Sequence, residues 1–151
     1  MDMPYAVIAE AYEKIEATTK RLEMTDLLVD LLKNTPKEMI DKVVYLTQGK
    51  ICPDFVGLEI GVAERLAVKA LAKASGRKET EIEESLTKTG DIGETAQNLI
   101  ANKRQVTFFQ QPLTVRKVYE TLDKMAKASG SGAIDLKTTL LAGVLADASP
   151  K

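Results

Sequence analysis

Two glycine-containing turns are places where the backbone itself could bind an anion. Gly61 stands at the start of one expected helix, and Gly90 and Gly93 stand at the start of another. The first turn of a helix carries unpaired N–H groups and the positive end of the helix dipole, so both turns could hold a phosphate. The alternative is that Gly61 and Gly90 only allow tight turns, and spacing alone favours this alternative.

A row of cations follows the first of these turns. Arg65, Lys69 and Lys73 recur every four residues, so they share one side of the expected helix. Most such rows are simply solvated faces. A row of phosphate contacts is the functional alternative, and it gains weight because the row follows the Gly61 turn.

The second turn carries its own carboxylates. Asp91 and Glu94 have the spacing of a helix cap and its third position, so Asp91 is expected to satisfy its own helix start rather than to bind a metal. A phosphate would have to compete with that carboxylate. Contacts at this turn are therefore expected from Lys88, Thr89 and the Gly90 backbone.

Composition limits other chemistries. A chain of 151 residues, 44% hydrophobic and 28% charged, fits one globular domain, and its net charge of −1 means that nucleic acid would need a local basic patch. Histidine is absent and Cys52 is alone, which removes the usual general base and an internal disulfide. The acidic segment of about 79–87 is expected to be solvated surface. A small helical enzyme that uses the acidic residues from about Glu81 to Glu94 is the weakest alternative.

Helical spacing of apolar residues runs through most of the chain. Thr25, Thr35 (with Glu38), Asp91 and Thr114 are expected to cap helices. A loop is expected over 49–60, because Pro53 cannot lie inside a helix. The helix of about 62–74 carries a face of small residues suited to close packing. No apolar run approaches the ~18 residues of a membrane span. The last helix is expected to carry enough aliphatic side chains to be sticky where they are left uncovered, namely Leu136, Leu140, Leu141, Val144 and Leu145.

Several motifs occur together in the order and spacing of a known family. They are Glu59-Ile60-Gly61-Val62-Ala63-Glu64, Ala74-Ser75-Gly76, Gly90-Asp91-Ile92-Gly93-Glu94 and Pro112-Leu113-Thr114-Val115, with Lys14 to Leu22 fitting at the start. Over nearly its whole length, Tyr5 to Pro150, the chain resembles the N-terminal DNA-binding domain of ATP-dependent DNA ligases of the archaeal and eukaryotic replicative type.

The resemblance implies an all-α single domain of about eight helices that binds duplex, nicked DNA without sequence preference, in the cytoplasm at the nucleoid, for replication, repair and recombination. Residues 1–151 would be the N-terminal portion of this domain, since the family domain continues with further helices and the Lys-x-Asp-Gly motif of the adenylation domain is absent. ATP and Mg²⁺ belong to those further parts, so this chain is expected to need no cofactor and to hold no catalytic or metal-binding residue. The expected DNA contacts are Gly61, Val62, Arg65, Lys69, Lys88, Thr89, Gly90, Gly93, Lys20 and Arg21.

A second partner is implied by the segment 102–112, where the helical pattern breaks. Gln105-Val106-Thr107-Phe108-Phe109 resembles the Gln-x-Ser-Phe-Phe variant of the sliding-clamp (PCNA) motif of archaeal ligases, with Thr107 in place of serine. Gln105, Phe108 and Phe109 are the expected clamp contacts. The alternative is that one or both phenylalanines fill the core. A helical interaction module that docks a clamp without binding DNA is the alternative function.

Overall fold

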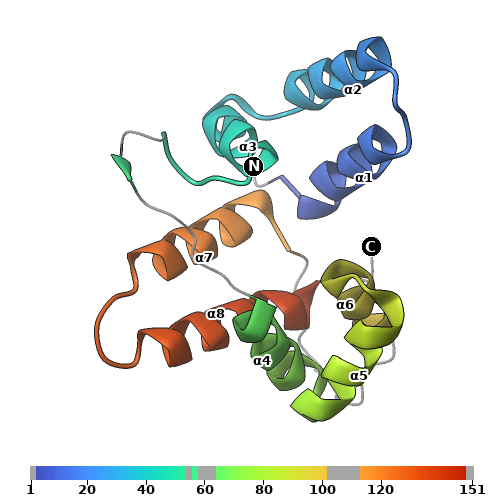
Figure 1. The fold of residues 1–151 in the computed structure, drawn as a ribbon. Coiled ribbons are helices and arrows are strands. Elements are labelled where there is room, and N and C mark those ends of the chain that lie inside the picture. Colours follow the sequence, from blue (N-terminus) through green and yellow to red (C-terminus); the bar gives the residue numbers. More distant parts are fainter. Residues whose placement is uncertain (1–2, 54–55, 58–63, 102–112, 149–151) are drawn as a thin grey trace.

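The computed structural model describes residues 3–53, 56–57, 64–101 and 113–148 (Figure 1). These ranges contain eight α-helices and no β-strand beyond a single bridge between Pro4 and Thr114, so the expected all-α fold is confirmed. None of the helices in these ranges has both the length and the apolar character that a membrane span requires. The elements are α1 (Tyr5–Glu16), α2 (Arg21–Lys33), the 3₁₀ turn η1 (Lys37–Met39), α3 (Ile40–Thr47), α4 (Glu64–Ser75), α5 (Glu79–Thr89), α6 (Ile92–Ala101), α7 (Val115–Lys127) and α8 (Ala133–Asp147).

The helices form two groups that α7 and α8 join. In the first group α1 packs on α2, and both α1 and α3 contact α7. In the second group α4 packs on α5, α6 and, most extensively, α8. Because α7 also packs on α8, the chain returns to the first group before it finishes in the second (Figure 1).

The core of the first group is built around Ile8, Val43 and Val115, which are fully buried. Two backbone hydrogen bonds hold the start of the chain against the start of α7. The Tyr5 N–H donates to the Leu113 carbonyl, and the Val115 N–H donates to the Met3 carbonyl, each at 2.8 Å. Residues more than a hundred positions apart are thereby fixed side by side.

The core of the second group surrounds α4. On one side Val68 and Leu71 pack against Ile82 of α5 and Leu99 of α6. On another side Ala70 and Ala74 pack against Ala142 of α8. Side chains this small allow two helices to approach closely, which agrees with the face of small residues expected from the sequence.

The expected caps divide into two that form and two that do not. Thr114 accepts a hydrogen bond from the Lys117 N–H at 3.1 Å, and Asp91 caps α6 as described below. The Thr25 and Thr35 caps are wrong. Each of these hydroxyls donates instead to the carbonyl four residues earlier, at 2.9 Å and 2.6 Å, because the chain before it is already helical.

The aliphatic residues of the last helix are only partly covered. Leu136 of α8 is 49% exposed, and Leu140, Leu141, Val144 and Leu145 are half-buried. The fully packed position of α8 is Ala142, because close contact with α4 leaves room there only for a small side chain. The expected loop after α3 is confirmed where it is described, since α3 ends at Thr47, before Gly49.

Candidate nucleic-acid interface

The cation row of α4 lies on the side of the helix that the cores leave open. Leu66, Ala70 and Leu71 are buried, whereas Arg65 is exposed and Lys69 is partly exposed. Successive members of the row rise about 6 Å along the helix axis. The burial of α4 on its other sides therefore fixes which way these cations point.

Lys73 continues the row and is held by α8. Its ammonium donates a hydrogen bond to the Thr139 hydroxyl at 2.9 Å. Thr139 is a neutral acceptor, so it orients the ammonium without compensating its charge. Sequence reasoning could not find this contact because 66 residues separate the two side chains.

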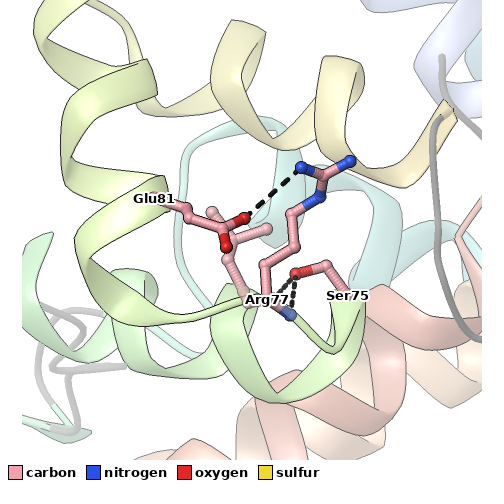
Figure 2. Close-up of polar contacts among 4 residues, drawn as sticks. Ser75, Arg77 and Glu81 are labelled. Atoms are coloured by element: carbon pink, nitrogen blue, oxygen red, sulfur yellow. Dashed lines mark hydrogen bonds and ion pairs between the residues drawn. The ribbon is translucent and has the colours of Figure 1, made fainter.

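Two hydrogen bonds and an ion pair hold the turn between α4 and α5 (Figure 2). The buried Ser75 hydroxyl donates to the Leu71 carbonyl at 2.6 Å and accepts from the Arg77 N–H at 3.4 Å. The Arg77 guanidinium lies 3.5 Å from Glu81, in the first turn of α5. Gly76, between them, has a φ of +72°, which glycine adopts without strain.

The same turn carries cations that sequence reasoning missed. Arg77 and Lys78 directly follow Gly76, and both line a shallow surface depression with Lys69 and Lys73. The signal in the sequence was an Arg-Lys pair just after a helix-ending glycine.

The turn between α5 and α6 is built differently from the expectation. Gly90 does not open α6. It closes α5 in the left-handed conformation, with a φ of +71°, and its N–H donates to the Leu86 carbonyl at 2.7 Å. Glycine is favoured here because this C-cap conformation is strained for other residues. The Thr89 hydroxyl lies 2.7 Å from that of Thr95, so it ties the two helices together.

Asp91 caps α6 as expected. Its Oδ1 accepts from the Gly93 N–H at 2.7 Å and from the Glu94 N–H at 3.3 Å. A Cβ on Gly93 would lie 3.2 Å from that oxygen, so glycine keeps the cap uncrowded. The N–H groups of Gly90 and Gly93 thus already have acceptors within the chain, and a phosphate would have to displace them. Lys88 is the exposed cation at this turn.

Lys20 and Arg21 lie in the other helix group. They stand at the turn between α1 and α2, where both are exposed and the Lys20 ammonium is 3.8 Å from Glu23. Figure 1 places this turn in the opposite half of the molecule from the turn between α4 and α5. The structure therefore does not bring these two cations together with the α4 row.

The remaining predicted contacts cannot be placed. Gly61 and Val62 lie outside the described residues, as do Gln105, Phe108 and Phe109. Among the residues that are described, no group of three or more histidine, cysteine or acidic side chains could hold a metal ion.

The fold and the cation row together define an all-α domain with a candidate phosphate-binding face. A family model described as "DNA ligase N terminus" matches residues 4–151, and the chain belongs to that family. The resemblance noted in the sequence is thereby confirmed.

Three relatives show the extent of the similarity. The chain is 52% identical to DNA ligase 2 of Thermofilum pendens, over 99% of the chain and 26% of that protein. It is 47% identical to the DNA ligase of Nitrosopumilus maritimus, over 98% of the chain and 25% of that protein. It is 43% identical to the DNA ligase of Thermococcus onnurineus, over 99% of the chain and 27% of that protein. The chain spans about a quarter of the length of these relatives.

Proposed function

We propose that this chain binds duplex DNA through its phosphate backbone, without preference for base sequence, as part of the DNA-binding domain of an ATP-dependent DNA ligase. The parent enzyme would act on nicked DNA in replication and repair. The observation that carries the proposal is the row of cations on the open side of α4 in a chain of this family.

The charge distribution supports contact with phosphates. The whole chain has a net charge of −1, so it has no general attraction for DNA. Arg65 and Lys69 place two cations about one helical turn apart on an open face. Each phosphate that a cation neutralises releases condensed counterions, which favours binding irrespective of sequence.

The other proposed contacts extend this face. Lys88 adds a cation at the end of α5. Gly61 and Val62 are proposed to offer backbone N–H groups before α4. Lys20 and Arg21 would meet a second stretch of backbone in the other helix group. Thr89, Gly90 and Gly93 are also proposed contacts, on condition that a phosphate displaces the acceptors that these groups have within the chain.

The experiment is a DNA titration over a range of salt concentrations. Lys69→Ala and Lys88→Ala should each weaken binding about equally for all sequences and flatten the slope of log K against log salt by roughly 0.9. Lys33→Ala is the matched control, because Lys33 is an exposed lysine at the end of α2 in the other helix group. Slopes that stay unchanged in both variants would refute the assigned face.

We propose a sliding clamp as a second partner, docked through Gln105, Phe108 and Phe109. The support is the Gln-x-Thr-Phe-Phe pattern, in which aromatic anchors would dominate a small interface. Replacing both phenylalanines by alanine should abolish clamp binding and leave thermal unfolding nearly unchanged. A core phenylalanine replaced by alanine typically lowers the free energy of unfolding by about 3–5 kcal/mol. If the variant loses stability on that scale and the parent chain binds no clamp, both rings belong to the core.

We place strand joining outside residues 1–151. The support is that the chain corresponds to about a quarter of ligases such as that of Nitrosopumilus maritimus. ATP and Mg²⁺ would act in those further parts of the parent enzyme. The role proposed for this chain is to hold the DNA, so the isolated chain should bind DNA without ATP or Mg²⁺.

A further inference from the structure

A cluster of positive charge surrounds the turn between α4 and α5. Lys69, Lys73, Arg77 and Lys78 line one shallow depression, together with Ala72 and a single carboxylate, Glu79. Counting Glu81, which pairs with Arg77, four cations face two carboxylates, which gives a local excess of two positive charges. The chain as a whole has a net charge of −1, so this excess is a local feature of the surface.

Most of this charge is free to act on a partner. In the described part of the chain no ion pair involves Lys69, Lys73 or Lys78. Lys73 is oriented by the neutral Thr139 hydroxyl, and Lys78 is exposed at the start of α5. Arg77 differs, because Glu81 lies 3.5 Å from its guanidinium. Arg77 therefore serves mainly to hold the turn that presents its neighbours.

We propose that the DNA-binding face continues past Lys69 through Lys73 to Lys78, so that one line of phosphate contacts follows α4 and passes round its C-terminal end. This inference rests on the proposed function. It assigns a phosphate contact to Lys73, the last member of the row, and adds Lys78 beyond it. It also sets the direction in which a DNA strand would run along the domain.

The spread of the cations favours a linear polyanion over a single free phosphate. From Arg65 to Lys73 the row extends about 12 Å along α4. A duplex strand offers one phosphate for every ~3.4 Å of helix axis, so three or four phosphates fall within that length. A small anion could touch only one or two of these side chains at a time.

The carboxylates of α5 mark where the face ends. Glu79 and Glu81 occupy the first turn of α5, and Glu83 and Glu84 follow on its exposed surface. A phosphate that moved onto α5 would meet these like charges. We therefore assign the contacts to the lysine side chains and not to the N-terminal N–H groups of α5.

The test uses two neighbouring variants that should act in opposite directions. Lys78→Ala should weaken duplex binding for every sequence and flatten the log K against log salt slope by roughly 0.9. Glu79→Gln should tighten binding, because it removes the one carboxylate in the depression. Lys78→Arg should keep the parental slope, and Lys33→Ala controls for the loss of one positive charge elsewhere. Thermal unfolding of each variant confirms that it is folded.

The outcomes separate this inference from the function on which it rests. If Lys69→Ala flattens the slope while Lys78→Ala and Glu79→Gln behave like the parent, the extended face is refuted and DNA binding stands. If the parent chain binds no DNA at low salt, both proposals are overturned. Opposite shifts for Lys78→Ala and Glu79→Gln would support the extended face.

Discussion

At the scale of single residues, Asp91 secures the start of α6. Its carboxylate accepts from the Gly93 and Glu94 N–H groups, which otherwise have no partner within the helix. Asp91→Ala should lower the free energy of unfolding by about 1 kcal/mol, the usual cost of losing a cap. Urea denaturation measures this as a shift of the midpoint at constant slope.

Two further variants make the cap test specific. Asp91→Asn keeps an acceptor oxygen at the same place and should retain most of the stability. Asp135→Ala removes a carboxylate from the first turn of α8, a helix whose N-cap, Gly132, provides no side chain for capping, and should cost less. Equal midpoints for Asp91→Ala and the parent chain would contradict the cap.

Tyr5 gives a prediction for alkaline pH. Its ring lines the groove between α1, α7 and α8, and burial, followed by the proximity of Tyr12, raises its pKa above the ordinary value of about 10. The unfolded chain therefore loses the Tyr5 proton first, so stability is unaffected below pH ~10 and falls as the pH rises toward the folded-state pKa.

Replacing Tyr5 by phenylalanine should make this alkaline loss shallower. Denaturation of both proteins at neutral pH, where the hydroxyl is un-ionised, measures the packing difference alone. Subtracting it isolates the ionisation effect at high pH. Some pH dependence should remain, because burial also raises the pKa of Tyr12 and Tyr119. Parallel stability curves for the two proteins above pH 10 would count against the assignment.

The residue types allowed the caps at Asp91 and Thr114 to be predicted but not the roles of Thr25 and Thr35. A threonine hydroxyl accepts from a helix start or donates to the carbonyl four residues earlier, and the choice depends on whether the preceding residues are helical. Gly90 was misplaced for a similar reason. Glycine suits either end of a helix, and α5 extends to Thr89, so Gly90 lies at its C-terminal end.

At the scale of elements, the contact between α4 and α8 depends on side-chain size. Ala142 is 6% exposed and packs against Ala70 and Ala74, so Ala142→Leu should destabilise the protein by about 1–3 kcal/mol. The adjacent Gly143 is exposed in the same helix, and a Cβ there would meet nothing within 4 Å.

Gly143→Ala is therefore the matched control, and it should change the free energy of unfolding in the opposite direction to Ala142→Leu. It should stabilise the protein by roughly 0.5–1 kcal/mol, because alanine loses less backbone entropy than glycine in a helix. Thermal unfolding of both variants gives the comparison. Destabilisation of similar size at both positions would show that α8 does not present Ala142 to α4 as described.

The spacing of apolar residues allowed the helices themselves to be predicted, including the small-residue face of α4. It did not reveal which helix that face would meet. Ala70 and Ala142 are far apart in the sequence, and α8 carries apolar residues on all sides, so no single face of it indicated a partner. The hydrogen bond from Lys73 to Thr139 could not be predicted for the same reason, because these residues are also far apart in the sequence.

At the scale of the whole molecule, the candidate DNA contacts fall into two sets, one in each helix group. The sequence identified Arg65, Lys69, Lys20 and Arg21 as candidates but could not give the distances between them. The first two belong to α4 and the last two to the turn between α1 and α2. Figure 1 shows α4 and this turn in opposite halves of the molecule. DNA that touched all four would have to extend across both helix groups.

The most direct test of the central claim is a salt titration of the parent chain with two duplexes of equal length and unrelated sequence. DNA binding through phosphates predicts the same affinity for both and one shared linear slope of log K against log salt, of about −0.9 for each phosphate neutralised. Specific sites typically exceed non-specific ones by at least ~10³ in affinity, so a preference of that order for one duplex would contradict the claim. Failure to bind either duplex at roughly 50 mM salt, where electrostatic binding is strong, would contradict it outright.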